Sequence, residues 1–350
     1  MNELHEVIGV MHIHSRYSDG SGKYHHIIKA AAALDLDFML FADHWTLEPR
    51  RLGLEGYHDG VLVGIGCELN DKQLQNHLLC FQMDDEIEEG AAAVDYTRQA
   101  VDAGAWTVVA HPDERRNHFA EFPSYPWDAW DSEDFHAIEI WNHLSEWMER
   151  LTRRNKWWLY VNPRRSVIRP TAWTLEKWDS LNLQRRVVGV GGVDAHAHHY
   201  PIWQNLSATI FPYKVAFRSI QVHVLLENPL EKQNAEKALQ SLFTAMRSGH
   251  VFVTNRYVGD ARGFRFWADN ENDGAVCQMG DRLPAASRLR FHYRLPADAT
   301  SAVLLKNTQP LHRIKEHSGS CNSSGPGVYR IEGFRHRRAF IYSNPIVITA

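Results

Sequence analysis

Nine side chains of metal-binding type lie in order along the chain, each at or near the end of an apolar run typical of a β-strand. They are His12, His14, Asp19, His44, Glu68, His77, His111, Asp194 and His196. Imidazole and carboxylate groups suit Zn, Mn and Fe, and nine donors exceed what a single ion can use. The residue types therefore predict a metal hydrolase that holds more than one ion.

The spacing of these residues supports the same reading. His12 and His14 are separated by one residue, and positions i and i+2 of a strand face the same way, so both imidazoles can reach one ion. Asp194 and His196 repeat this spacing after a later strand. The two oxygens of Glu68 could bridge two ions.

Three further residues are candidates for catalysis: Asp43, Arg115 and His198. Asp43 could accept a hydrogen bond from a neighbouring histidine and fix its tautomer. Arg115 and Arg116 follow an Ala-His-Pro motif, where a guanidinium would suit a phosphate or a developing oxyanion, although a solvated loop is an equal alternative. His198 lies close to the ligand motifs and could act in proton transfer, as could others. Those others are His118, His143 and His199.

The composition is that of a globular protein with one unusual feature. The 350 residues are 44% hydrophobic and 23% charged, with a net charge of −4. That balance argues against an electrostatic grip on nucleic acid or anionic lipid, although it leaves room for a local basic patch. Histidine stands out with 21 copies, which favours metal chemistry.

Targeting and redox signals are lacking in the sequence. The four cysteines are far apart, so neither a disulfide framework nor a thiolate zinc site is expected. No signal-peptide pattern opens the chain and no run of 18 apolar residues occurs, so we expect a cytoplasmic protein with no membrane span.

Strand-like and helical runs alternate through the first two-thirds of the chain. The expected strands cover residues 7–13, 38–42, 61–67, 77–81, 106–110, 137–141 and 187–193. Helices are expected over residues 24–34, 89–103 and 234–248, with Gly104 and Gly249 as C-terminal caps. This α/β alternation predicts a parallel sheet, and polar donors at the strand ends favour a distorted (β/α)7 barrel with its site at the C-terminal face.

The pattern changes to strands alone near residue 260. Runs at residues 263–268, 288–295, 302–306, 327–332 and 339–342 are separated by turn residues, which indicates a small antiparallel β-sandwich. We therefore expect a barrel domain over residues 1–255 and a sandwich domain over residues 256–350. Every metal ligand should lie before residue 200.

The motif order resembles that of the polymerase and histidinol phosphatase (PHP) family of metal-dependent phosphoesterases. His-x-His-x4-Asp-Gly, Asp-His, Gly-x-Glu, His, Ala-His-Pro and Asp-Ala-His follow one another within residues 7–200. The resemblance implies a (β/α)7 barrel with two or three divalent ions of Zn, Mn or Fe, and a hydroxide that attacks phosphorus. It further implies three ligand sets, with Glu68 shared between the first two. They are His12, His14, Glu68 and Asp194; Glu68, His77 and His111; and Asp19, His44 and His196.

The C-terminal sequence resembles a particular branch of that family. Residues 338–348 and 239–254 are similar to segments of the carbaryl-hydrolase-like (CehA/McbA) branch, which implies a carboxylic or carbamic aryl ester as the alternative substrate. The alternative from a different class of function is a non-catalytic binding module, in which the complete set of metal ligands would have no catalytic role. The expected partner is a small phosphoester or ester, with no nucleic acid and no membrane, and the oligomeric state is open.

Overall fold

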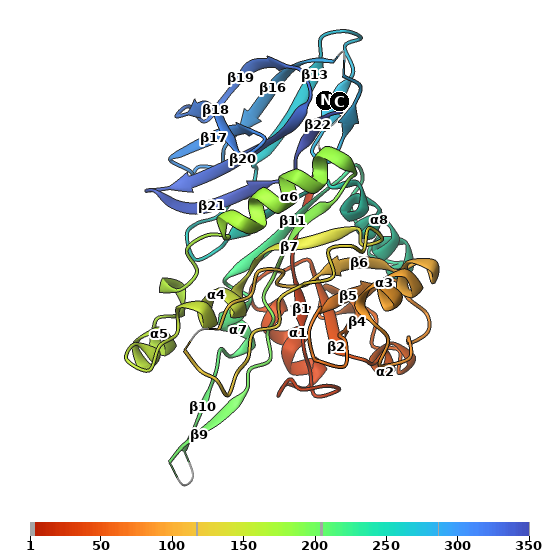
Figure 1. Ribbon diagram of the computed structural model, residues 1–350, viewed down its shortest axis with the longest axis vertical. Helices are drawn as coiled ribbons and strands as arrows, with labels where there is room; N and C mark the ends of the chain where they lie inside the picture. The colour runs from red at the N-terminus through yellow and green to blue at the C-terminus, as the bar shows by residue number, and fades with distance from the viewer. Residues whose placement is uncertain (1–3, 117, 204–205, 286, 350) are drawn as a thin grey trace.

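The structure, a computed structural model, describes residues 4–116, 118–203, 206–285 and 287–349. It is mixed α/β, and its described strands form one 16-stranded sheet, one four-stranded sheet and one two-stranded sheet. Figure 1 shows an elongated molecule, with the N-terminal two-thirds in the lower part and the C-terminal strands above.

The bounds of the elements are as follows. The strands up to residue 255 are β1 (His5–Ile13), β2 (Phe38–His44), β3 (Gly56–His58), β4 (Val61–Leu69), β5 (Leu78–Phe81), β6 (Trp106–Val109), β7 (Ala137–Asn142), β8 (Val188–Gly192), β9 (His199–Trp203), β10 (Leu206–Thr209), β11 (Ile220–Leu226) and β12 (Val251–Asn255). The helices are α1 (Tyr24–Ala32), α2 (Glu48–Arg51), α3 (Ala93–Asp102), α4 (His143–Arg150), α5 (Lys156–Val161), α6 (Ala172–Gln184), α7 (Tyr213–Ala216) and α8 (Ala235–Ser248), with a 3-10 turn at Pro163–Arg165. The later strands are β13 (Arg265–Asn270), β14 (Val276–Gln278), β15 (Arg282–Leu283), β16 (Arg288–Arg294), β17 (Ser301–Lys306), β18 (Gln309–Ile314), β19 (Ser318–Ser324), β20 (Gly327–Arg335), β21 (Arg338–Ser343) and β22 (Ile346–Ile348).

Seven strands of the large sheet lie side by side in the order β1-β2-β4-β5-β6-β7-β8. The segment after β8 returns to β1, where the backbone N–H of Val193 donates to the carbonyl of Met11 at 3.0 Å and that of Ala195 to His12 at 3.2 Å. These bonds connect the last strand to the first. The ends of β1, β2, β4, β6, β7 and β8 that carry polar residues therefore meet on one side.

All seven strands predicted for this region are present, within two residues of their expected bounds. Helix α8 also matches, with Asn234 as its N-cap and Gly249 at φ 80° after its last turn, a conformation that glycine adopts without steric cost. The expected parallel sheet is wrong at β5, which pairs antiparallel with both β4 and β6. No helix separates β4 from β5 or β6 from β7 in the described chain, so the alternation is irregular there.

The C-terminal strands continue the large sheet. β21 pairs antiparallel with β12, from Phe252 opposite Ser343 to Thr254 opposite Ile341. A second sheet, β14-β13-β16-β19, lies over these strands, and a hydrophobic cluster fills the space between them. Leu225 and Phe252 belong to this cluster although they precede residue 255. The strand register thus crosses the expected domain boundary, which the sequence pattern did not indicate.

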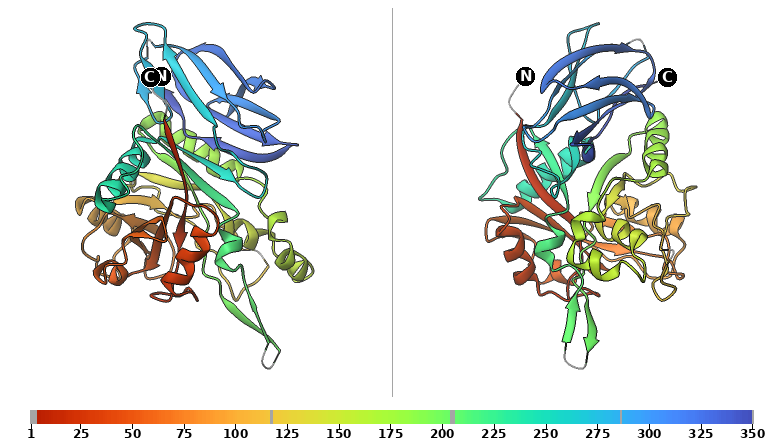
Figure 2. Two further views of the ribbon diagram at one scale, coloured as in Figure 1. Left: turned by 180° about the vertical axis from the view of Figure 1, so that it is seen from behind. Right: turned by 90° about the vertical axis from the view of Figure 1, so that its left-hand side faces the viewer.

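One hairpin lies outside the packed body of the molecule. The β9–β10 hairpin extends away from the body at the end opposite the C-terminal strands, as both views in Figure 2 show. None of the helices in the described ranges has the length and apolarity that a membrane crossing needs.

Candidate metal centre

Glu68 lies at the centre of the predicted ligands. It ends the parallel pairing of β4 with β2, which sets it directly opposite His44, and it is 1% exposed. Its Oε2 lies 3.3 Å from Nε2 of His12, 3.2 Å from Nε2 of His14 and 3.5 Å from Nε2 of His44. Three imidazoles therefore surround one carboxylate oxygen.

The other oxygen of Glu68 faces different imidazoles. Its Oε1 lies 2.8 Å from Nδ1 of His77 and 3.6 Å from Nε2 of His111. His77 directly precedes β5 and His111 lies two residues after the end of β6, and these are the two strands that come after β4 in the sheet. The two oxygens of one buried carboxylate are thus divided between two sets of nitrogens.

Asp194, two residues after the end of β8, lies beside the imidazoles of His12 and His14. Its Oδ1 lies 3.5 Å from Nε2 of His12, 3.6 Å from Nε2 of His14 and 3.3 Å from Nδ1 of His196. The donor atoms of His12, His14 and Asp194 all lie within 4.8 Å of one another, as do those of His12, Glu68 and His111.

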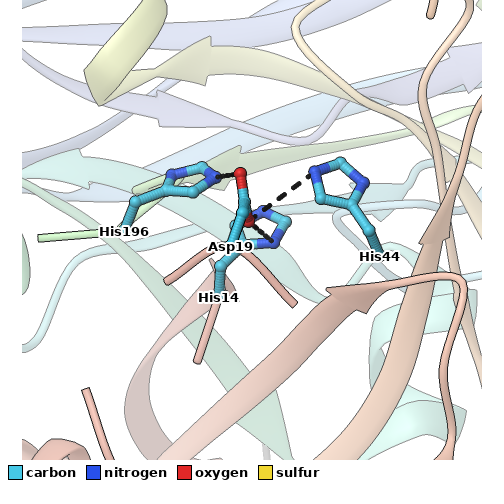
Figure 3. A group of neighbouring side chains, drawn as sticks. All are labelled: His14, Asp19, His44 and His196. Carbon is cyan, nitrogen blue, oxygen red and sulfur yellow. Dashed lines mark ion pairs between the residues drawn. The ribbon is translucent and has the colours of Figure 1, made fainter. Parts of the chain in front are cut away.

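A further group forms around Asp19, in the loop that follows β1. Figure 3 shows its carboxylate between the imidazoles of His14, His44 and His196. Its Oδ2 lies 3.2 Å from Nε2 of His196, and its Oδ1 lies 3.6 Å from Nδ1 of His14 and 3.9 Å from Nε2 of His44. His14 therefore stands between two groups, with Nε2 toward Glu68 and Nδ1 toward Asp19. The ligand sets implied by the family resemblance gave it to one group only.

The chemistry of these donors fits a cation. Five ring nitrogens of these groups are buried and have no hydrogen-bond partner in the part of the chain that the structure describes. They are Nε2 of His12, Nδ1 and Nε2 of His14, Nδ1 of His44 and Nδ1 of His111. An unpartnered buried polar atom costs free energy, and a cation held between the donors would remove that cost. Together with the distances above, these atoms make the groups suitable for divalent metal ions.

The carboxylates of the centre are held in their anionic form. Burial alone would raise the pKa of Glu68, but His12, His77 and His44 outweigh it and hold that pKa well below its usual range. Burial likewise opposes the charge of Asp194, and His12, His196 and neighbouring imidazoles lower its pKa. Both groups therefore present the ionised oxygens that a metal ion requires.

Three of the predicted ligands have left-handed backbone conformations, which side chains other than glycine rarely adopt. The φ angles are 65° at His12, 27° at His111 and 49° at Asp194. The pairing of β1 with β2 also shifts register between Met11 and Ile13, so a bulge breaks the strand at His12. His12 and His14 do converge, as predicted, but through this bulge and not through regular alternation. Strain of this kind is frequent at functional sites.

Glu139 is the residue that the sequence analysis missed. It lies in the middle of β7, where its Oε1 is 2.8 Å from Nδ1 of His12 and its Oε2 accepts the backbone N–H of His111 at 2.9 Å. A side chain at Gly192 on neighbouring β8 would overlap this carboxylate. Glu139 thus orients His12 and His111. It has the role that was expected of Asp43, which is to fix the tautomer of a ligand histidine.

We expect Glu139→Gln to weaken metal binding about 10–100-fold, because a neutral amide no longer supports the His12 ring or raises its basicity. Competitive titration with a zinc chelator measures the affinity. Glu146→Gln is a matched control, since Glu146 is also buried but accepts from Trp141, Ile168 and Arg169. Equal affinities in the two variants would contradict the role given to Glu139.

Asp43 has a different set of contacts from those expected. It is buried, and it accepts hydrogen bonds from the backbone N–H and hydroxyl of Ser15 at 2.7 and 2.8 Å and from the hydroxyls of Ser18 and Tyr24 at 2.8 and 3.3 Å. It makes no hydrogen bond with a histidine in the described chain. Asp43 therefore fixes the loop that carries Asp19, so the expectation that it orients a histidine is corrected.

The arginines after the Ala-His-Pro motif have unequal positions. The side chain of Arg115 is 56% exposed and pairs with Asp113 at 2.9 Å. Arg116 is only 12% exposed, pairs with Glu114 at 2.7 Å and lies 5.0 Å over the ring of Tyr125. That ring stacks on His77 at 5.3 Å. Arg116, and not Arg115, is therefore linked through one ring to the metal-binding group.

His198 lies beside the Asp19 group. Its ring stacks on that of His196 at 4.8 Å, and it is half-buried. Burial, together with the positive charge of His196, lowers the pKa of His198. This shift favours the neutral imidazole, the form that can accept a proton.

Comparison with known proteins yields structural likenesses alone. No family model matches the chain, and no curated protein matches it. A two-domain protein from Bacteroides vulgatus, described as containing a predicted PHP-like metal-dependent phosphoesterase, is similar with a TM-score of 0.46 and 14% identity, over 98% of this chain and 96% of that one.

Two further solved structures are similar over part of the chain. A proposed metal-dependent phosphoesterase from Bifidobacterium adolescentis has a TM-score of 0.33 and 13% identity over 57% of this chain and 92% of its own. An amidohydrolase from Chromobacterium violaceum, with bound sulfate, has a TM-score of 0.35 and 12% identity over 59% of this chain and 92% of its own. At these values the chemistry must be inferred from the side chains described above.

Proposed function

We propose that this chain is a metal-dependent hydrolase of the PHP type that acts on phosphoesters with two or three ions of Zn, Mn or Fe. The observation that carries the proposal is the division of the two Glu68 oxygens between separate sets of imidazoles. A carboxylate in that position suits two neighbouring cations. The proposal includes the fold. The seven strands β1, β2 and β4 to β8 would form a distorted (β/α)7 barrel, and the C-terminal strands a β-sandwich.

The residues that would hold the ions are the nine predicted from the sequence. When bound, such ions supply Lewis acidity, neutralise developing negative charge and lower the pKa of water. The chain itself fixes the donors through Glu139 and through the bulge at His12. His198 is the proposed proton acceptor beside this group.

The preference for a phosphoester rests on Arg116. Its Nε is buried and has no hydrogen-bond partner among the described residues, while Nη2 donates to Glu114 at 2.7 Å. A cation with an unused donor, one aromatic ring away from His77, suits an anionic substrate. A carboxylic or carbamic aryl ester is uncharged and would gain less from the positive charge of Arg116.

We expect the purified chain to carry two or three transition-metal ions and to hydrolyse an aryl phosphate faster than an aryl ester. Elemental analysis and the two assays measure this. A variant with His25→Gln and His26→Gln, both exposed and outside the centre, should keep its metal. At most one ion per chain after reconstitution would contradict the multinuclear site. Faster ester cleavage would favour the carbamate-hydrolase alternative, and metal binding without turnover would favour a binding module.

Metal affinity should also rise with pH, because the ligands must lose their protons to bind. Burial opposes the charge of His111 and His196, but nearby carboxylates outweigh it and raise the pKa values to about 9 and about 8. Binding at neutral pH therefore displaces protons. Calorimetry in buffers of different ionisation enthalpy measures their number, and a count of zero would contradict this expectation.

A further inference from the structure

Residues 150–170 are strongly basic although the whole chain has a net charge of −4. The segment has seven cationic residues and no Asp or Glu. The cations are Arg150, Arg153, Arg154, Lys156, Arg164, Arg165 and Arg169. Only Arg150 forms an ion pair with a described residue, Glu146, at 3.3 Å. The others leave their charge uncompensated by the part of the chain that the structure describes.

The same segment exposes large apolar side chains. Trp157 and Trp158 on α5 are 55% and 54% exposed, Val161 is 69% exposed and Ile168 is 45% exposed. The segment is nevertheless anchored, because Leu159 and Val167 between them are 4% and 1% exposed. Its fold therefore holds the four side chains outward, and α5 stands out from the body in Figure 1.

A neighbouring arginine adds to the charge of this surface. Arg338 at the start of β21 donates to the backbone carbonyl of Arg164 at 3.3 Å. Burial, with the positive charges of Arg165 and Arg164, lowers the pKa of Arg338. Cations are thus gathered here in spite of their mutual repulsion, which an anionic partner would relieve.

We propose that the surface formed by residues 150–170 docks on an anionic lipid bilayer. Tryptophan rings and aliphatic side chains enter the boundary between headgroups and acyl chains, while Lys and Arg contact the headgroup phosphates. Single-stranded nucleic acid would also meet the cations and stack on Trp157 and Trp158, but it has no use for exposed Val161 and Ile168. The aliphatic residues therefore favour lipid.

The position of this surface relates it to the metal centre. Arg169 lines a pocket together with His111, Glu139 and Asn142. Docking through residues 150–170 would thus bring the rim of the centre close to the bilayer. The binding itself does not depend on the proposed function, and it is measured without turnover.

Co-sedimentation of the full chain with vesicles tests the proposal. We expect binding to phosphatidylcholine vesicles that contain phosphatidylserine, little binding to phosphatidylcholine alone, and loss of binding as salt is raised. Each cation near the surface contributes roughly five-fold in affinity, so Arg164→Glu with Arg165→Glu should weaken binding at least ~25-fold. Arg313→Glu with Lys315→Glu, an exposed pair on the C-terminal strands, changes the charge equally and should have little effect.

A second pair of variants tests the apolar contribution. Trp157→Ser with Val161→Ser should lower binding to the anionic vesicles, whereas Val276→Ser with Leu311→Ser, at 47% and 44% exposure, should not. Thermal unfolding shows whether each variant remains folded. Equal binding by the Arg164/Arg165 variant and its control would overturn the proposal. So would tight binding of a single-stranded oligonucleotide with no binding to anionic vesicles.

Discussion

Replacing Glu68 with glutamine is expected to remove at least one metal ion per chain and to lower hydrolysis by on the order of 10³-fold or more, since a bound ion supplies several kcal/mol of transition-state stabilisation. The amide retains the shape of the side chain but offers one neutral oxygen in place of two anionic ones. Five imidazoles within 3.6 Å of the carboxylate would lose their common partner.

Glu55→Gln provides the matched control for this experiment. Glu55 accepts from the backbone N–H of Ile65, which lies on β4 as Glu68 does, and it pairs with Arg50 at 3.3 Å. In the described chain it forms no hydrogen bond or ion pair with the imidazoles of the centre. Metal content by elemental analysis and turnover of an aryl phosphate should both stay near the parent values in that variant. Full metal content and parent turnover in Glu68→Gln would exclude the bridging role.

The ligand positions could be predicted from sequence because of where strands end. Glu68, His111 and Asp194 each follow an apolar run, and the ends of neighbouring strands meet at one edge of a sheet. What the sequence could not show is how the ligands divide, since the bulge at His12 redirects its side chain. Nor could it show that His14 lies between two groups, with Nε2 toward Glu68 and Nδ1 toward Asp19.

Asp43 and Glu139 show why supporting residues are harder to predict. Neighbouring residues of a strand point to opposite faces, so Asp43 points away from the side to which His44 points. Glu139 was hidden within an apolar strand, although an acidic residue between Ile138 and Ile140 is itself a signal, because a buried carboxylate needs partners. Apart from Asn142, which donates to Glu139 at 2.8 Å, the hydrogen-bond partners of both residues lie in segments distant in the sequence.

The sequence analysis missed both the basic surface and the sheet that the two parts of the chain share. Composition averages the charge of residues 150–170 over 350 residues, and pattern analysis follows one strand at a time. The pairing of β12 with β21 joins segments separated by most of the C-terminal part. Only the folded chain shows that the two parts are held together by a continuous sheet.

A buried ion pair joins the same two parts at a second place. Arg330 on β20 is 1% exposed, its Nε lies 2.8 Å from Asp179 on α6, and its Nη1 lies 2.6 Å from Glu332. Its guanidinium also lies 5.5 Å from the centre of the Trp178 ring. Helix α6 leads into β8, the strand that precedes Asp194. The C-terminal strands therefore support the element that positions this ligand.

We expect Arg330→Met to lower the free energy of unfolding by about 3–5 kcal/mol, because Asp179 and Glu332 would be left without their buried counter-charge. Urea denaturation of the full chain measures the change. Adding Asp179→Leu should recover much of the loss, since removing both charges also removes the cost of desolvating them. Arg313→Met, at an exposed site on β18, is the control and should change stability by less than about 0.5 kcal/mol. A loss of similar size in Arg330→Met and in this control would show that the pair does not hold the C-terminal strands to α6.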